Sequence, residues 1–139
     1  MHNIHIQFPN HHYSGPVLVN DESLEADLDL MTTFHVDDPI DKTLEPIMGL
    51  LAEFYQFGAD YFEKGKLSGD DVAAKLRMHL GEIWLGNRAK SNFSYHFIGV
   101  WPHSVNFGKL CFSSDPSFDL EITWRYQKCE LCDLIAFQG

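Results

Sequence analysis

The stretch that most constrains the fold runs from residue 44 to residue 64, with the sequence LEPIMGLLAEFYQFGADYFEK. Its apolar residues recur at spacings of three and four, which places them on one face of an α-helix. They are Ile47, Leu50, Leu51, Phe54, Gly58, Tyr61 and Phe62. Pro46 falls in the first turn, where a backbone N–H has no helical partner to lose, and Gly65 supplies a stop. The pattern predicts a central helix whose apolar face packs on a sheet.

Length and composition favour one globular domain, residues 1–139. The chain is 45% hydrophobic and 14% aromatic, which favours a packed interior over disorder. Its first residues, MHNIHIQF, carry no Lys or Arg, unlike a signal peptide. No window approaches the roughly 18 consecutive apolar residues of a membrane span. We therefore expect a cytoplasmic protein.

The charge of the chain is strongly negative and unevenly placed. Twenty acidic and ten basic residues give a formal net charge of −10. No Lys or Arg precedes Lys42, whereas this first part contains Asp21, Glu22, Glu25, Asp27, Asp29, Asp37, Asp38 and Asp41. Such a surface repels nucleic-acid phosphates and anionic membranes and attracts basic partners. Direct nucleic-acid binding and membrane binding are therefore disfavoured.

The N-terminal third alternates in a way that predicts strands. Ile4, Ile6 and Phe8 have the two-residue period of a half-buried strand, residues 11–16 resemble a loop, and residues 17–19 a short second strand. From residue 24 to residue 36 the alternation predicts a further strand. Its apolar face would carry Leu24, Ala26, Leu28, Leu30, Thr32, Phe34 and Val36, and its other face Glu25, Asp27 and Asp29.

The rest of the chain predicts a second helix and then a β-meander. Ser68 and the acids after it suit a helix N-terminus, and Val72, Leu76, His79, Leu80 and Ile83 recur on one face before a stop at Gly86. Strands are expected at 93–101, 105–112, 118–126 and 131–137, with turns at 102–104, 113–117 and 127–130. The expected fold is therefore α+β, a mostly antiparallel sheet of N- and C-terminal strands packed on a central two-helix hairpin.

Cysteine and histidine offer candidate chemistry that the spacing does not complete. Cys129 and Cys132 form a CxxC, but no second CxxC or spaced histidine pair completes a four-ligand zinc site. Together with Cys111 they make three cysteines, and an odd number favours reduced, packed thiols over a set of disulfides. His2, His5, His11, His12 and His35 gather near the carboxylates, which leaves a metal or acid–base site as an alternative to solvated histidines. We expect no metal or other cofactor, and His79 to be a hydrogen-bonded core residue.

No catalytic motif is present: the chain lacks GxSxG, HExxH and a glycine-rich phosphate loop. We therefore assign no catalytic residue. The candidate partner-binding residues are Glu22, Glu25, Asp27, Asp29, Asp37, Asp38 and Asp41. On a strand, alternate carboxylates repeat every 6.6–6.8 Å or so, a row that imitates phosphates to a basic protein. Tyr13, Tyr55, Trp84 and Trp101 are candidate apolar anchors or core residues.

As a type, a small acidic α+β chain rich in aromatic residues and without a catalytic signature resembles bacterial immunity proteins. These neutralise nuclease toxins, including those of contact-dependent growth inhibition. The resemblance covers the whole chain, rests on no motif and transfers no residue role. It implies tight stoichiometric binding to a basic toxin domain, with carboxylates covering the place of the substrate phosphates.

Three functional hypotheses follow from the sequence. The first is an acidic protein that inhibits a basic protein partner, such as a nuclease toxin. The second is a small enzyme or metal-dependent protein that uses the N-terminal His/Asp group or Cys129 and Cys132. The third is a subunit that associates with itself, with an edge strand such as residues 4–8 pairing between chains.

Overall fold

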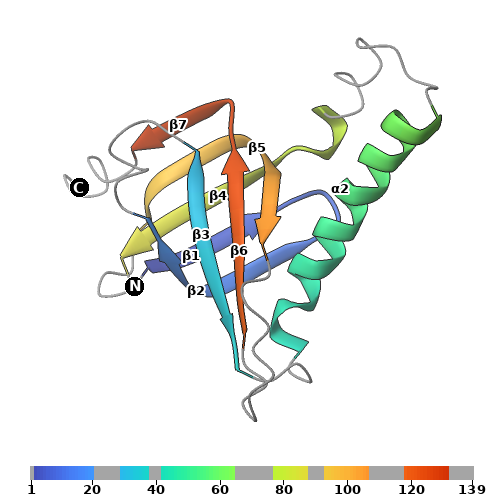
Figure 1. The fold of residues 1–139 in the computed structure, drawn as a ribbon. Coiled ribbons are helices and arrows are strands. Elements are labelled where there is room, and N and C mark those ends of the chain that lie inside the picture. Colours follow the sequence, from blue (N-terminus) through green and yellow to red (C-terminus); the bar gives the residue numbers. More distant parts are fainter. Residues whose placement is uncertain are drawn as a thin grey trace.

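The computed structural model describes residues 2–20, 29–37, 42–64, 77–87, 93–106 and 118–131. These residues form seven strands, one long helix and a short 3₁₀ turn (Figure 1). The strands are β1 (His2–Gln7), β2 (His12–Val19), β3 (Leu30–Val36), β4 (Gly81–Asn87), β5 (Phe93–Asn106), β6 (Phe118–Arg125) and β7 (Lys128–Leu131). The 3₁₀ turn η1 (Lys42–Leu44) leads into the helix α2 (Glu45–Lys64).

Six of the strands close into a barrel. The strand order is β4-β1-β2-β3-β6-β5, and β4 pairs back with β5 to complete the ring. Every pairing is antiparallel, and β7 adds to the outside of the ring by pairing with β5. Closure depends on the 14-residue strand β5, whose first half pairs with β4 and whose second half pairs with β6.

The bend that lets β5 serve both walls lies at Gly99. This residue has a φ of +68°, a conformation that side chains with a Cβ adopt reluctantly. The backbone N–H of Gln127 donates to the carbonyls of Ile98 and Gly99 at 3.0 and 3.2 Å. Because the Gln127 side chain lies directly against Gly99, a Cβ there would collide with it. Glycine at this position therefore permits both the bend and the close approach of the β6–β7 connection.

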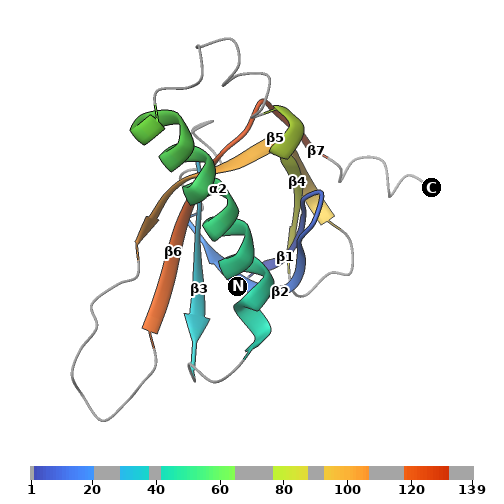
Figure 2. The same cartoon turned by 90° about the vertical axis from the view of Figure 1, so that its right-hand side faces the viewer.

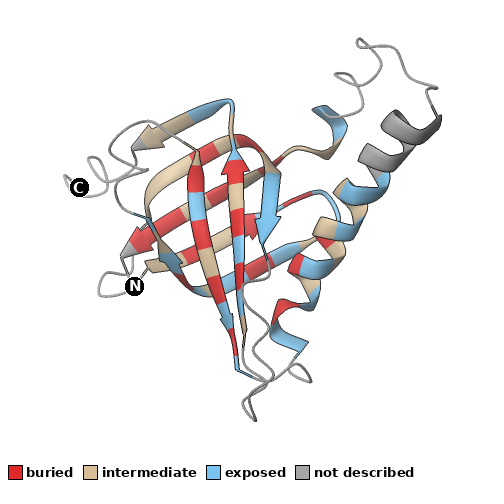
Figure 3. Ribbon diagram, in the orientation of Figure 1, coloured by how far each residue is buried: buried red, intermediate tan, exposed pale blue. Residues whose placement is uncertain are grey.

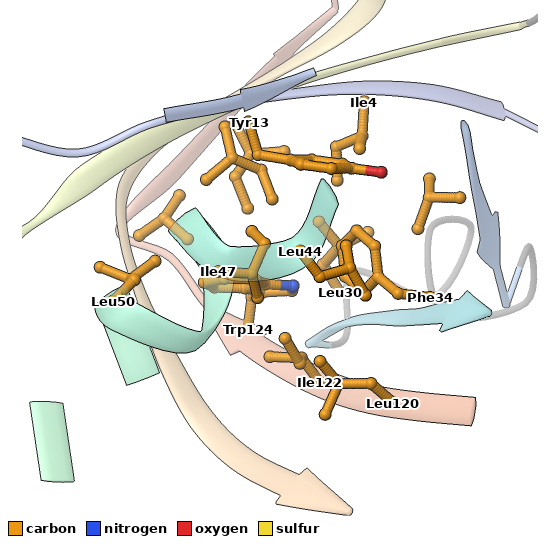
Figure 4. Close-up of a cluster of buried hydrophobic side chains, with 14 of the residues drawn as sticks. Ile4, Tyr13, Leu30, Phe34, Leu44, Ile47, Leu50, Leu120, Ile122 and Trp124 are labelled. Atoms are coloured by element: carbon orange, nitrogen blue, oxygen red, sulfur yellow. The ribbon is translucent and has the colours of Figure 1, made fainter. Parts of the chain in front are cut away.

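The core fills the barrel with the inward side chains of alternating strands. In β3, Leu30, Thr32, Phe34 and Val36 are buried, as the alternation predicted. Leu120, Ile122 and Trp124 of β6 point inward beside them (Figures 3 and 4). Thr32 is the buried polar residue among these. Its hydroxyl donates to the Ile122 carbonyl at 3.0 Å and accepts from the Trp124 indole N–H at 2.9 Å. Both groups of this buried pair are thereby satisfied.

Helix α2 lies against one side of the barrel (Figure 2). Leu44, Ile47 and Leu50 enter the core, and Leu51 and Phe54 pack at its margin. Beside them, the Glu53 carboxylate lies 2.9 Å from His11 Nε2 and 3.5 Å from His79 Nδ1. The helix is therefore held by an apolar face and by a carboxylate between two histidines from other parts of the chain.

The predicted α+β fold, a sheet packed on a two-helix hairpin, is wrong, because the described residues form a mostly β structure: a closed barrel with one long helix. Residues 81–85, assigned to the second helix, and the predicted stop at Gly86 belong to strand β4 of the barrel wall. Ile83 and Leu85 are fully buried and Trp84 is not, which is the two-residue period of a strand. The spacing of three from Leu80 to Ile83 fits one face of a helix, but Leu80 precedes the strand, and on a strand residues three apart point to opposite sides. Residues 77–79 are helical, and residues 65–76 lie outside the described residues.

Other boundaries were predicted with mixed success. The helix predicted at 44–64 is confirmed and begins one residue later, at Glu45. The strands predicted at 4–8 and 118–126 are confirmed too, with ends that differ by one or two residues. The loop at 11–16 is wrong, because β2 begins at His12. The turn at 102–104 is wrong too, since β5 continues through it with only a shift of register. Most of the predicted turn at 127–130 belongs to strand β7, which begins at Lys128. The predicted strands at 105–112 and 131–137 lie mostly outside the described residues.

Candidate interaction surface

The outer face of β3 and β6 carries the side chains that alternate with the core. His35 pairs across the strands with Asp119, Thr33 with Glu121, and Met31 with Thr123. Figure 1 shows these two strands side by side on the face turned to the viewer. The register therefore creates one continuous outward surface that mixes carboxylates with apolar groups.

An apolar patch interrupts this polar face. Leu18 is 49% exposed and Met31 46% exposed, and they lie on the adjacent strands β2 and β3. The Asn20 N–H donates to the Met31 carbonyl at 3.1 Å, which fixes the register beside them. Both side chains and Glu121 line a shallow groove. Within the described part of the chain, the Glu121 carboxylate has no ion-pair partner. We call Leu18, Met31 and Glu121 the sheet patch.

A histidine between two carboxylates lies at the end of β3. His35 Nδ1 is 2.7 Å from Asp119, and its Nε2 is 2.7 Å from Asp37. The hydrogen bond to Asp119, followed by the negative charge of Asp37, raises the pKa of His35 above its ordinary value near 6.5. This exposed group gains positive charge more readily than a free histidine and partly neutralises the two carboxylates.

The predicted acidic site is only partly described. Asp29 and Asp37 are placed, and both lie beside cationic groups: Asp29 is 3.5 Å from Arg125 Nε, and Asp37 contacts His35. Glu22, Glu25, Asp27, Asp38 and Asp41 lie outside the described residues. The row of carboxylates on residues 25–29 therefore stays a prediction.

A second apolar patch lies on the side of the molecule where α2 runs. Met48 and Tyr55, one helical repeat of seven apart, are 42% and 77% exposed. Met78, 74% exposed, lies in the helical residues 77–79, whose His79 approaches Glu53 on another side of α2 from Tyr55. Lys42 and Arg77 are exposed, and neither has an ion-pair partner among the described residues. We call Met48 and Tyr55 the helix patch.

The two patches account for most of the exposed large apolar side chains. The described residues include six such side chains: Leu18, Met31, Met48, Tyr55, Met78 and Val105. Four of the six fall in the sheet patch or the helix patch. Scattered apolar side chains are normal on a protein surface, but their grouping marks candidate interfaces.

The N-terminal histidines do not converge on one site. His5 hydrogen-bonds Ser14, His11 bonds Glu53, and His35 bonds Asp37 and Asp119, in three separate places. In the described ranges, no three His, Cys, Asp or Glu side chains are placed to hold a metal ion. The described histidines of the N-terminal third therefore take part in separate contacts and not in one shared cluster.

Five strands contribute one row of side chains on the wall formed by β1, β4 and β5. Their register aligns Ser14, His5, Trp84, His96 and Glu130. The rings of Trp84 and His96 stack with centroids 4.5 Å apart and planes inclined by 10°. The ring of His5 lies 5.3 Å from Trp84 on the other side. Lys128 lies 2.9 Å from Glu130, and its hydrogen bond lowers the pKa of that carboxyl. The Trp84 ring therefore packs between the His5 and His96 rings on the barrel wall.

Other candidate residues have structural positions. Tyr13 is buried and contacts Phe34 edge to face, so it is core and not an anchor. Trp101 is half-buried, and Tyr55 is exposed as an anchor would be. Cys129 packs partly buried against the core, while Cys111 and Cys132 lie outside the described residues. His79 is half-buried beside Phe54 and Glu53, at the margin of the core.

Sequence reasoning missed the sheet patch. Leu18 and Met31 are apolar residues at outward positions of their strands: Leu18 follows the inward Val17, and Met31 precedes the inward Thr32. That departure from alternation was the available signal.

Comparisons with known proteins place the fold but no family. No protein-family model and no curated protein matches the chain. Among solved structures, the chain is similar to one in the cryo-EM structure of the anti-feeding prophage (AFP) baseplate, 6-fold symmetrised. The likeness has a TM-score of 0.51 at 12% identity and covers 96% of this chain and 93% of the other. At this identity, it shows a shared fold.

Within the described residues, α2 and the other helical segments are too short or too polar to cross a membrane.

Proposed function

We propose that this protein is a structural subunit that associates with copies of itself. The observation that carries the proposal is the grouping of exposed apolar side chains in two patches, four of six in the described residues. An interface core needs such groups, and single-chain proteins seldom gather them without a partner.

The fold comparison supports the same function. The similar chain belongs to a baseplate described as 6-fold symmetrised, and the likeness extends over nearly the whole of both chains.

The route of association differs from the one expected from the sequence. Strand β1, which contains most of residues 4–8, pairs with β2 on one edge and β4 on the other. It therefore has no free edge for pairing between chains. Association through side chains of the outer surface therefore replaces pairing of residues 4–8 between chains.

The test is the mass of the purified chain in solution, measured by sedimentation velocity and light scattering from about 1 μM to 1 mM. One chain has a mass of 16.0 kDa, and we expect larger species that increase with concentration. Copies with a net charge of −10 repel one another over about 30 Å at 10 mM salt but only about 8 Å at 150 mM. Salt should therefore strengthen the association. A 16.0 kDa species at every concentration and salt would refute the proposal.

Inhibition of a basic partner stays a second candidate, favoured by the net charge. Here salt has the opposite effect, because it screens attraction between an acidic chain and a basic partner. A pull-down from host lysate at low and raised salt tests it. Stoichiometric capture of one basic protein that is released by salt would favour this function over self-association.

A further inference from the structure

We propose that a crevice between β2, β3 and η1 binds a small, uncharged apolar molecule of about the size of one aromatic ring. The crevice lies where β2 and β3 separate, and its volume is about 180 Å³. Binding of such a molecule does not require self-association. Its chemical class follows from how the strands separate, which side chains line the opening and which charges surround it.

The crevice exists because β2 and β3 pair over a short distance. Within the described strands, only Leu18 with Thr33 and Val19 with Thr32 are opposed in this ladder. By contrast, β3 pairs with β6 through seven residues, and β2 pairs with β1 through six. The remaining parts of β2 and β3 therefore separate, and η1 lies at the opening between them.

Pro16 explains why the ladder stops. The Asn20 N–H donates to the Met31 carbonyl, and opposed residues of an antiparallel pair exchange hydrogen bonds at every second position. Continued to Pro16, the same register would oppose it to His35 in a hydrogen-bonded pair. Proline has no N–H to donate, so this pair cannot form as a normal ladder step. The sequence of β2 thus ends the pairing and leaves the opening.

Apolar side chains of the core line the inner part of the crevice. They are Tyr13 and Val17 of β2, Phe34 and Val36 of β3, and Leu44 of η1, each at most 9% exposed. The Tyr13 and Phe34 rings meet edge to face with centroids 5.5 Å apart, and Figure 4 shows Leu44 near both. An apolar cavity of about 150 Å³ in another protein binds benzene. At about 180 Å³, this crevice has room for one ring of that size.

The mouth of the crevice determines the charge of the ligand. Its exposed lining residues are Pro16, Leu18, His35, Asp37 and Thr43. His35 and Asp37 lie 2.7 Å apart, so each already has a partner of opposite charge when His35 is protonated. An anion would be repelled by Asp37 and by the net charge of −10. A charged group of either sign would also lose hydration among the apolar side chains, which favours a neutral ligand.

The experiment uses the full chain with ¹³C-labelled methyl groups and toluene as the probe. Toluene is titrated while the methyl shifts are recorded by NMR, and intermolecular NOEs locate the bound ring. We expect saturable shifts and NOEs at the methyl groups of Val17, Val36 and Leu44, with a Kd of about 1 mM. Benzoate has the same ring with a carboxylate in place of the methyl group, and should bind at least about tenfold more weakly.

Two variants test the location of the site. Val36→Phe places a ring in the crevice from β3 and should weaken toluene binding at least about tenfold, because two rings cannot occupy the same space. Val105→Phe is the matched control, since it makes the same substitution on β5 at a residue that is 38% exposed and outside the crevice lining. This control should bind toluene as the unmodified chain does.

The opposite results would overturn the proposal. Absence of saturable shifts in the unmodified chain, or NOEs to methyl groups outside the crevice lining, would show that the crevice does not take the probe. Equal binding of benzoate and toluene would contradict the ligand class. A Val36→Phe variant that binds toluene normally but associates less would assign the crevice to a side chain of another copy. If Val36→Phe fails to fold, the NOEs of the unmodified chain decide, since they locate the ring without a substitution.

Discussion

Gly99 and Gln127 meet where strand β5 bends, and the Gln127 backbone N–H donates to the Gly99 carbonyl at 3.2 Å. The Gln127 side chain occupies the space that a Cβ on Gly99 would need. The bend, the positive φ and the glutamine contact therefore depend on one another.

Gly99→Ala should destabilise the protein. The left-handed backbone conformation alone costs a non-glycine residue about 1–2 kcal/mol, and displacement of Gln127 adds to this. Urea denaturation followed by circular dichroism measures the loss. Gly49→Ala is the matched control, since it lies inside α2, where the gain of about 1 kcal/mol in helix propensity offsets a close approach of 3.2 Å to the His11 ring. Equal stability of the two variants would show that the bend does not require glycine.

Thr32→Val should leave the Trp124 indole N–H buried without an acceptor. We expect a loss of about 1–3 kcal/mol, the usual cost of an unsatisfied buried polar group. Thr32→Ser keeps the hydroxyl and should recover part of this loss, although it removes a buried methyl group. Denaturation of the two variants side by side gives the comparison. A valine variant as stable as the serine variant would argue against a structural role for this hydrogen bond.

His35 should titrate above pH 6.5, as measured by NMR of its imidazole protons. Its pKa is raised by the hydrogen bond to Asp119 and by Asp37, so the folded state binds this proton more tightly than the unfolded state does. The stabilisation from this group is therefore complete below about pH 6.5 and is lost as the pH rises through the raised pKa. Asp119→Asn should return the pKa towards its ordinary value, and Asp37→Asn should do so by a smaller amount.

Substitutions on the two faces of α2 should affect different properties, the inward face stability and the outward face self-association. Ile47→Ala removes a fully buried side chain and should cost about 2–5 kcal/mol of stability. Met48→Ala, at the next position but 42% exposed, should cost less than about 0.5 kcal/mol and should weaken self-association. Thermal unfolding and sedimentation velocity, applied to both variants, separate the two roles. A stable Ile47→Ala variant would contradict the packing of α2 on the barrel.

The sequence predicted local structure where one period dominated. Residues 45–64 have an unambiguous helical spacing, and β3 and β6 alternate cleanly, so these elements and their buried residues were found. Residues 81–85 were misassigned because Leu80 and Ile83 have the three-residue spacing of a helix face. The alternating burial of Ile83, Trp84 and Leu85 follows from pairing of the strand in the barrel wall.

Barrel closure was beyond the sequence pattern for a different reason. It depends on pairing of β1 with β4, more than seventy residues apart, and on one strand bending at Gly99 to serve two neighbours. Pro102 favoured the prediction of a turn, but β5 continues through this residue because the register shifts beside it. The sheet patch was missed with it, since its members come together only when β2, β3 and β6 are adjacent.

Because β5 belongs to both walls, the β4–β5 and β5–β6 pairings share one strand. Loss of the β4 pairing therefore loosens the strand that β6 also needs. Amide protons of β4 and of β6 should accordingly share one free energy of opening, once each residue's intrinsic exchange rate is accounted for.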